Sequence, residues 1–445
     1  MCFPRRTKSF AACRTRRQAS HELSRNLIAL IGRLRKIYVK PIAMPMLISY
    51  YPIYRSFALR RKKIGGQSMP AAVQSPGALS PYRVFDLSES IAGQYCCRML
   101  ADYGAEVTLL EPPGGTITRH IGRFREKPGA DRESLLFFHL NLGKASMLVD
   151  QTTEQGRALL VDLARAADVL VVPAGFERKA LKAANPKLVV AVVSPFGEDG
   201  PKRNWRGTEM VYQALSGMMI HNGRRDREPL YGVGDRASYC AGIAAYSSIL
   251  SALMVRERTG VAQEVAIDVA LTAASMTYPF ALQYSYNGTF EEREGRIRPL
   301  IEVKCADGWI AIWIRANTFG AVCEGLGAPE LSDDPRFAGD VARRDNFKEL
   351  VTEVQNRVAD KRASDVIDAL ASRRVVCACC FQPTRLGPDA PHLKAREYWQ
   401  TVPTADGERN VLGPQFRMSR TPWRTAAAPA FGPLQQTSQE EGADA

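Results

Sequence analysis

Short apolar runs alternate with longer segments of helical periodicity between residues 82 and 286. The apolar runs predict buried strands over Tyr82–Leu87, Glu106–Leu110, Ser146–Val149, Val169–Val172, Leu188–Val193 and Val265–Val269. The periodic segments predict helices over Ala92–Tyr103, Glu154–Ala166, Glu209–Met219, Ala237–Arg258 and Ala270–Tyr286. Strands that alternate with helices favour a parallel sheet covered on both faces, so we expect an α/β fold for the large domain, residues 81–286.

The pattern changes after residue 286. Residues 287–298 are polar and charged, which is typical of a linker. Residues 299–385 predict a smaller α+β domain, with a hairpin over Ile301–Trp313 that turns at Asp307-Gly308 and helices over Phe319–Leu326 and Phe347–Ala359. Residues 386–430 contain prolines and lack a regular period, so we expect an irregular return segment that packs on the large domain. Residues 431–445 are expected to be a disordered tail.

The formal net charge of +14 comes from the N-terminal end of the chain. Residues 1–70 carry 16 Lys or Arg and a single acidic residue, which leaves 44 basic and 45 acidic residues in the remainder. A neutral globular part argues against nucleic acid as a partner, because nucleic-acid binding depends on a basic face. For residues 1–80 three interpretations stay open: a mis-assigned start with initiation near Met44, Met46 or Met69, a disordered tail, or a segment that targets the protein or binds an anionic surface.

The N-terminal extension does not predict a membrane span. Its longest uncharged run, Pro41–Tyr54, is too short to cross a bilayer and contains three prolines. The ten cysteines and five histidines form no pair of C-x-x-C motifs, so we expect no metal site. Free thiols are typical of a reducing compartment, and we expect a cytoplasmic protein.

The first strand-helix-strand unit ends at Glu111 and therefore suggests a dinucleotide site. However, the turn over Ser90–Tyr95 has one glycine, Gly93, where the dinucleotide fingerprint needs three. Bulky Ile91 and Tyr95 would keep a pyrophosphate away from the backbone. The sequence therefore argues against a nicotinamide-dependent dehydrogenase, and it contains no Walker loop, H-E-x-x-H or G-x-S-x-G motif.

A series of short motifs follows in order along the chain: Val84–Ser88, Ala92-Gly93, Leu100–Val107, Glu111–Gly115, Asn141–Lys144, Val193–Gly197, Gly234-Asp235, Arg256–Gly260 and Asp307–Trp309. Their order and spacing resemble the class III CoA-transferase family of the CaiB/BaiF type, which includes formyl-CoA transferase, carnitine CoA-transferase and α-methylacyl-CoA racemase. The resemblance covers about residues 82–424.

The resemblance implies a Rossmann-like large domain and a small domain in an interlocked homodimer. It implies a transferase of acyl-CoA metabolism that moves CoA from an acyl-CoA donor to a small organic acid. CoA is then a substrate, and no permanently bound cofactor is expected. Transferases of this family use an aspartate that forms an acyl anhydride and then an aspartyl-CoA thioester.

Two carboxylates are the catalytic candidates. Asp235 follows Gly232-Val233-Gly234 and begins a long helix, where free N–H groups and the positive helix end favour an ionised carboxylate. An Asp at a helix start is more often an N-cap, and the resemblance is what favours the nucleophile. Glu209 is the second candidate, and its alternative is a buried helix residue paired with a base.

Four residues are candidates for binding CoA by the same resemblance. Lys144 is expected to hold a CoA phosphate as a point charge, with a solvated loop lysine as the alternative. Arg119 is a weaker candidate for the same task. Ala92 and Gly93 match the segment that opens the first helix of the large domain.

The sequence departs from the family pattern where CoA packs. Val171–Gly175 replaces the family's E-N-F-x-P-G segment, and Ala145 stands where the family has an arginine. A degenerate homologue that binds acyl-CoA without turnover therefore stays open. An acyl-CoA racemase or isomerase is the other alternative, although Thr208-Glu209 replaces the racemases' His-Asp pair and racemisation uses two bases.

Overall fold

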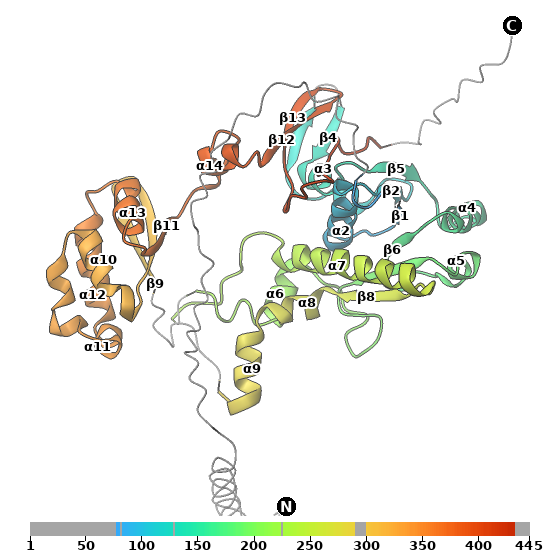
Figure 1. Ribbon diagram of the computed structural model, residues 1–445. Helices are drawn as coiled ribbons and strands as arrows, with labels where there is room; N and C mark the ends of the chain where they lie inside the picture. The colour runs from blue at the N-terminus through green and yellow to red at the C-terminus, as the bar shows by residue number, and fades with distance from the viewer. Residues whose placement is uncertain (1–76, 81, 128–129, 224–225, 290–299, 432–445) are drawn as a thin grey trace, which may run out of the picture. The chain divides into compact units, whose positions relative to one another are not determined.

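The computed structural model describes residues 77–80, 82–127, 130–223, 226–289 and 300–431 (Figure 1). The chain separates into two units, Met1–Pro70 and Ala71–Ala445, and every element described below belongs to the second. Residues 1–76 of the expected N-terminal extension, most of the expected linker and nearly all of the expected C-terminal tail lie outside the described residues.

A six-stranded sheet forms the centre of the large domain, in the order β5-β2-β1-β6-β7-β8. Its strands are β1 (Arg83–Asp86), β2 (Glu106–Glu111), β5 (Ala145–Leu148), β6 (Val169–Pro173), β7 (Val189–Ser194) and β8 (Glu264–Asp268). Every neighbouring pair is parallel. The chain order reverses between β1 and β6, as in doubly wound folds, so the predicted α/β class with a parallel sheet is confirmed.

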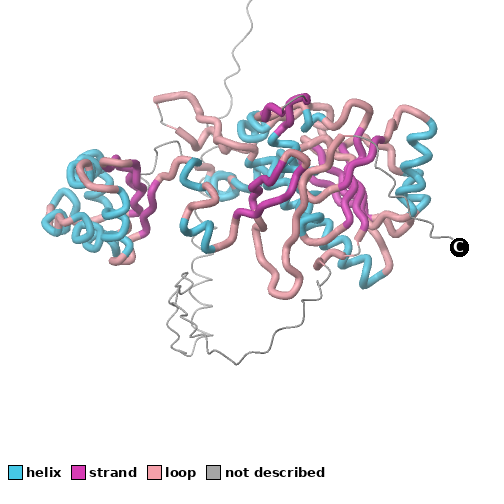
Figure 2. The backbone as a smooth tube through the Cα atoms, turned by 90° about the horizontal axis from the view of Figure 1, so that it is seen from above, coloured by secondary structure: helices cyan, strands magenta, loops and turns pink. Residues whose placement is uncertain are grey.

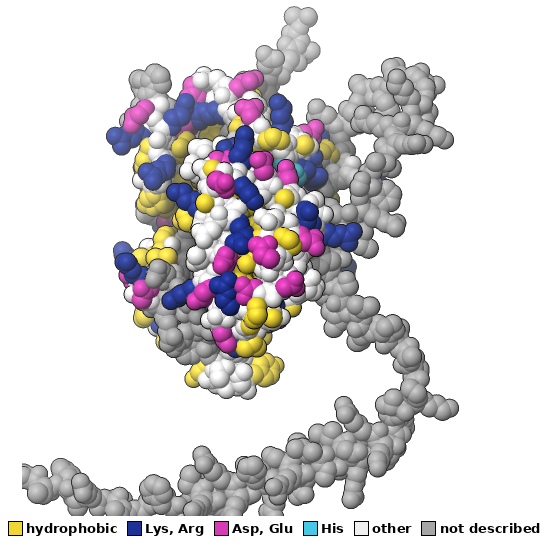
Figure 3. Space-filling view, turned by 90° about the vertical axis from the view of Figure 1, so that its left-hand side faces the viewer, with side chains coloured by type: hydrophobic (Ala, Val, Ile, Leu, Met, Phe, Trp, Pro, Cys, Tyr) yellow, Lys and Arg dark blue, Asp and Glu magenta, His cyan; other side chains and the backbone are white. Residues whose placement is uncertain are grey.

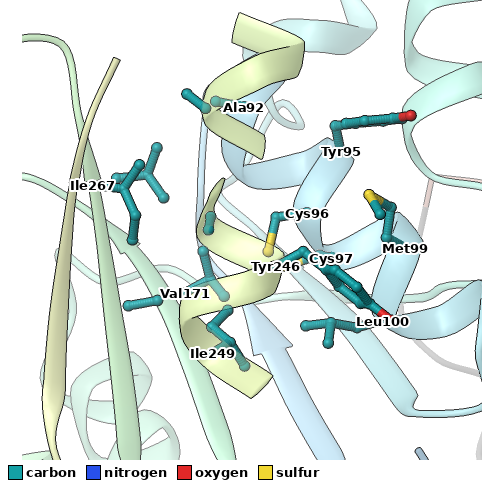
Figure 4. Packing of buried hydrophobic residues seen from close by; sticks show 14 of the residues in the cluster. Ala92, Tyr95, Cys96, Cys97, Met99, Leu100, Val171, Tyr246, Ile249 and Ile267 are labelled. Atoms are coloured by element: carbon teal, nitrogen blue, oxygen red, sulfur yellow. The ribbon is translucent and has the colours of Figure 1, made fainter. Parts of the chain in front are cut away.

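Helices cover both faces of this sheet, because its strands are apolar at successive positions. On one face α2 (Ile91–Asp102) and α7 (Arg236–Thr259) pack over Val171 and Ile267. Figure 4 shows Cys96 of α2 and Ile249 of α7 pointing into this core. On the other face α4 (Glu154–Arg165) and α5 (Lys179–Ala184) pack over the alternate strand residues. Every cysteine in the described residues is a free thiol.

Helix α7 is the longest helix in the described part of the chain. Among the described residues it is the one helix long and apolar enough to cross a membrane by length and composition. Its buried stripe of small residues explains that composition, since Ala237, Ala241 and Ala245 face α2 and the sheet. At Gly242 a Cβ atom would lie 2.8 Å from the carbonyl oxygen of Ala92, so the two helices approach too closely for a larger residue.

One predicted helix is wrong. The segment 270–286 is two helices, α8 (Val269–Met276) and α9 (Tyr278–Asn287), which meet at Thr277. The Thr277 hydroxyl donates to the carbonyl of Ser216 at 2.6 Å, and Pro279 in the first turn of α9 has no N–H to continue the earlier helix. Helix α6 (Glu209–Leu215) also ends before the predicted Met219, because Gly217 has φ +82°.

Residues 300–379 have a hydrophobic core of their own. An antiparallel sheet, in the order β11-β10-β9, consists of β9 (Leu300–Cys305), β10 (Gly308–Trp313) and β11 (Val376–Cys379). The same residues form four helices: α10 (Phe319–Leu326), α11 (Asp340–Asp345), α12 (Phe347–Val358) and α13 (Ala363–Ala371). The predicted hairpin is confirmed, with Ala306-Asp307 as its loop. Figure 3 shows basic and acidic side chains interspersed on one face of the molecule. This agrees with the nearly equal numbers of basic and acidic residues after residue 70.

The expected irregularity of residues 386–430 is wrong, because these residues include a helix and two strands. Helix α14 (Pro391–Ala395) precedes a hairpin of β12 (Trp399–Thr404) and β13 (Gly407–Leu412). Val402 and Val411 pack with Phe138 of α3 (Leu135–Leu140), which follows a hairpin of β3 (Phe124–Lys127) and β4 (Ala130–Ser134). Figure 2 shows, from above, helices on both sides of the strands that form the central sheet.

Candidate active site

The start of α7 carries the candidate nucleophile. Gly234, with φ +83°, turns the chain into Asp235, which is the N-cap residue of α7. The Asp235 side chain is half-buried and makes no capping hydrogen bond. Its backbone carbonyl accepts the first helical bond, from the Tyr239 N–H at 2.9 Å. The Asp235 side chain therefore does not cap the helix, and the alternative interpretation of Asp235 as an N-cap side chain is wrong.

Glu209 takes the place of the missing cap. Its Oε1 accepts from the Ala237 N–H at 2.7 Å, and its Oε2 accepts from the Ser238 N–H at 3.1 Å and the Ser238 hydroxyl at 2.9 Å. These are the N–H groups that an N-cap side chain normally satisfies. The structure thus brings both predicted carboxylates together at one helix end, and it uses Glu209 to hold that end.

Gln213, one turn after Glu209 on α6, fixes the loop before Asp235. Its amide nitrogen donates to Glu209 Oε1 at 2.9 Å and to the Gly232 carbonyl at 3.2 Å, while its amide oxygen accepts from the Gly232 N–H at 2.9 Å. Gln213 is only 1% exposed. Sequence reasoning missed Gln213 and Ser238, although the spacing of Glu209 and Gln213 by one helical turn was visible.

The electrostatics favour a basic carboxylate at this position. Burial raises the pKa of Asp235, and the negative charge of Glu209 raises it further. Burial and the Asp235 charge raise the pKa of Tyr239 to about 12, and burial also raises that of Tyr231. Both phenols therefore stay neutral near pH 7. A half-desolvated carboxylate beside neutral phenols suits attack on an electrophilic carbonyl carbon.

Lys144 lies inside the protein. Its ammonium donates at 2.8 Å to Asp86 Oδ2, to Asn141 Oδ1 and to the Gln94 carbonyl, and the side chain is fully buried. An ammonium has three hydrogens, and all three are donated within the protein. This geometry contradicts both the phosphate contact expected of Lys144 and the solvated alternative, and gives it a structural role at the end of β1.

Arg119 is held in a similar way at the end of β2. Its guanidinium makes two hydrogen bonds to Glu111, at 2.7 and 2.6 Å, and lies 3.7 Å from the ring centre of Phe137. Burial alone would raise the pKa of Glu111, but the hydrogen bonds from Arg119 and Ser146 lower it below its usual range. The Arg119 guanidinium therefore forms a two-hydrogen-bond ion pair with Glu111.

Ala92 and Gly93 serve the packing of α2. Both are buried, and a Cβ atom on Gly93 would lie 2.4 Å from the Ser88 side chain. The Gly93 N–H donates to the Ser90 hydroxyl, which caps α2. Helix α2 reaches the Asp235 region through Tyr95, whose ring meets that of Tyr239 edge-on at 4.6 Å.

Two cavities, of about 100 and 460 Å³, share Tyr398 and Gln415 as lining residues. Neither is lined by Asp235 or Glu209, so the carboxylates and not the cavities locate the candidate site. Within the described residues, no cluster of three or more His, Cys, Asp or Glu side chains could hold a metal ion.

Comparison with known proteins gives the same family along most of the chain. Residues 79–433 match the model of CoA-transferase family III. Formyl-CoA:oxalate CoA-transferase of Streptomyces avermitilis is 30% identical over 388 residues, which cover 80% of this chain and 93% of that protein. Succinyl-CoA:mesaconate CoA-transferase of Haloarcula hispanica is 31% identical over 367 residues, which cover 78% and 91%. The crystal structure of a CAIB/BAIF family protein from Brucella suis has a TM-score of 0.72 and 28% identity, covering 80% of this chain and 96% of that one.

Proposed function

Because the chain belongs to CoA-transferase family III, we propose that it moves CoA from an acyl-CoA donor to a carboxylic acid through a covalent intermediate on Asp235. The observation that carries the proposal is the free, half-buried carboxylate of Asp235 at a helix start where Glu209 has taken the capping bonds. The named relatives act on oxalate and mesaconate. A small organic acid is accordingly the proposed acceptor class.

The chemistry proceeds in balanced steps. The Asp235 carboxylate attacks the thioester carbonyl, the C–S bond breaks, and CoA leaves as a thiolate, which gives an acyl anhydride of Asp235. The thiolate then attacks the aspartyl carbonyl, which releases the donor acid and leaves an aspartyl-CoA thioester. The acceptor carboxylate displaces CoA from this thioester, and CoA attacks the acceptor carbonyl of the new anhydride, which frees Asp235.

CoA is proposed to lie outside the carboxyl ends of β1 and β6, where the strand order reverses. Ala92 and Gly93 lie there, in the first turn of helix α2. In this proposal Lys144 and Arg119 do not contact CoA, because their charges are paired with Asp86 and Glu111 inside the protein. Glu209 acts on the reaction through Asp235.

Covalent trapping tests the proposal. The full-length protein is incubated with acetyl-, succinyl-, formyl- and oxalyl-CoA and quenched with hydroxylamine, and its peptides are mapped by mass spectrometry. We expect a hydroxamate on Asp235 with at least one donor. Asp235→Asn should give none, and Glu228→Gln, an exposed carboxylate in the same loop, should label like the wild type. A donor that binds without forming an adduct on Asp235 would refute the nucleophile and leave the racemase or the non-catalytic interpretation.

A homodimer is proposed as the working assembly. Large apolar side chains are exposed on α6, α8 and α9, namely Met210, Leu271, Leu282, Tyr284 and Tyr286. Exposed apolar groups gathered on adjoining elements are typical of a subunit interface.

We expect sedimentation equilibrium to give the mass of two chains at micromolar concentration. Leu271→Glu should shift the protein toward monomer, because Leu271 is 69% exposed on α8 and a charge there would oppose burial. Val341→Glu, at a residue 60% exposed on α11, is the matched control and should leave the mass unchanged. A wild-type protein with the mass of one chain would contradict the proposed dimer.

A further inference from the structure

Four helices of the large domain begin with an N-cap side chain that bonds to the first turn. Ser90, Ser134, Thr153 and Asp268 each accept a hydrogen bond from the N–H three residues on, and so cap α2, α3, α4 and α8. Asp235 is of an equally good capping type, yet its side chain accepts from none of the N–H groups of α7. Local sequence therefore favours a cap at Asp235, and a residue from another helix prevents it.

The competing acceptor comes from α6 and is fixed by two side chains. Ser238 donates its hydroxyl and its N–H to one oxygen of Glu209, and it is 7% exposed. Gln213 donates to the other oxygen. We propose that Ser238 is a positioning residue, whose hydroxyl holds Glu209 over the first turn of α7 and thereby keeps the Asp235 carboxylate free to react. This inference rests on the proposed function, because it assigns a task to Ser238 in presenting that nucleophile.

The physical reason is competition for the same two N–H groups. A carboxylate that accepts backbone N–H bonds is stabilised in its charged form and becomes less basic. While Glu209 holds the Ala237 and Ser238 N–H groups, Asp235 is denied that stabilisation and also meets the charge of Glu209. Without the Ser238 hydroxyl, Glu209 loses one of its four hydrogen bonds, and Asp235 gains access to the helix end.

The other ionisable side chains near Asp235 include two phenols and a guanidinium. Tyr231 and Tyr239 are the phenols whose titration the Asp235 charge affects, and burial raises the pKa of both. The Arg236 guanidinium donates to the Val233 carbonyl.

The test compares Ser238→Ala with Ser238→Thr, which retains a hydroxyl. Ser247→Ala is the control, because Ser247 lies on the exposed side of α7 and its hydroxyl binds only the Ile243 carbonyl of its own helix. The first readout is the Asp235 carboxyl signal of ¹³C-aspartate-labelled protein, assigned with Asp235→Asn and titrated by NMR. We expect the Asp235 pKa of Ser238→Ala to fall by about one pH unit, with Ser238→Thr and Ser247→Ala close to the wild type.

The second readout is the rate of CoA transfer. We expect kcat of Ser238→Ala to fall roughly 10-fold, with its acidic limb moved to lower pH and KM for acyl-CoA unchanged. An Asp235 titration that is unchanged in Ser238→Ala would overturn the inference, even if Asp235→Asn is inactive. Conversely, a shifted titration in a protein that transfers no CoA would refute the proposed function and leave the positioning of Asp235 by Ser238 intact.

Discussion

Replacing Asp235 by asparagine is expected to lower kcat for CoA transfer by roughly 10⁴-fold or more, with the fold intact. The amide keeps the shape of the side chain but lacks the charged oxygen that forms the anhydride, and removing a nucleophile abolishes the covalent route. The measurement is steady-state transfer between the best donor and acceptor, followed by separation of the acyl-CoA species. Residual activity of more than a few per cent in Asp235→Asn would contradict the assigned role.

The pH dependence of the wild-type protein provides a second test. Since burial and Glu209 raise the pKa of Asp235, the wild-type rate should fall as the pH drops through a value above the usual range of an aspartate. The raised pKa also means that ionisation of Asp235 costs stability in the folded protein. That stability is present at low pH, where the group is protonated in both states, and is lost as the pH rises through the folded pKa.

Asp235→Asn should therefore unfold at a slightly higher temperature than the wild type at pH 7, and at the same temperature near pH 3. Glu228→Gln, whose side chain is exposed, should show neither effect. A variant that loses activity and melts at a much lower temperature would instead have lost structure. A functional carboxylate held against its own stability is a common feature of active sites.

The large domain was predictable because its elements are locally consistent. Buried parallel strands are apolar at successive positions, and their ends in the structure lie within a residue or so of the expected ends. Two of the three described hairpins, β9-β10 and β12-β13, show where this fails. Both turn on Ala-Asp followed by glycine, at Ala306-Asp307 and at Ala405-Asp406. The first lies between strongly apolar strands and was predicted, whereas the second lies between Trp399–Thr404 and Gly407–Leu412, whose polar positions and Pro403 obscure the pattern.

The surroundings of the candidate site could be predicted only in part. Placing Asp235 at the start of a long helix needs only local periodicity and the preceding glycines. That Glu209 would satisfy the N–H groups of Ala237 and Ser238 could not be predicted, because the two helices are joined by a long loop and meet only in the folded chain. Lys144 illustrates the same limit, since a polar loop residue reads as exposed until the partners around it are known.

Replacing Lys144 by methionine is expected to cost about 3–5 kcal/mol of folding stability, or roughly 10 °C in Tm, because it leaves the Asp86 carboxylate buried without its counter-charge. Asp86 would keep only the Ser88 N–H and hydroxyl as partners. Thermal and urea unfolding measure the effect. Lys187→Met, at an exposed lysine, should change stability by less than about 0.5 kcal/mol.

The double variant Asp86→Leu/Lys144→Met tests whether Lys144 serves in a buried ion pair or binds CoA. Removing both charges should recover a large part of the stability lost in Lys144→Met, since a buried ion pair and a well-packed apolar pair differ little in net energy. Isothermal titration with CoA supplies the second measurement. If Lys144 acts only within the protein, the folded double variant should bind CoA with nearly the wild-type Kd. A stable Lys144→Met variant with a Kd weakened 10-fold or more would return Lys144 to the CoA phosphate, because a charge that contacts the ligand affects binding more than folding.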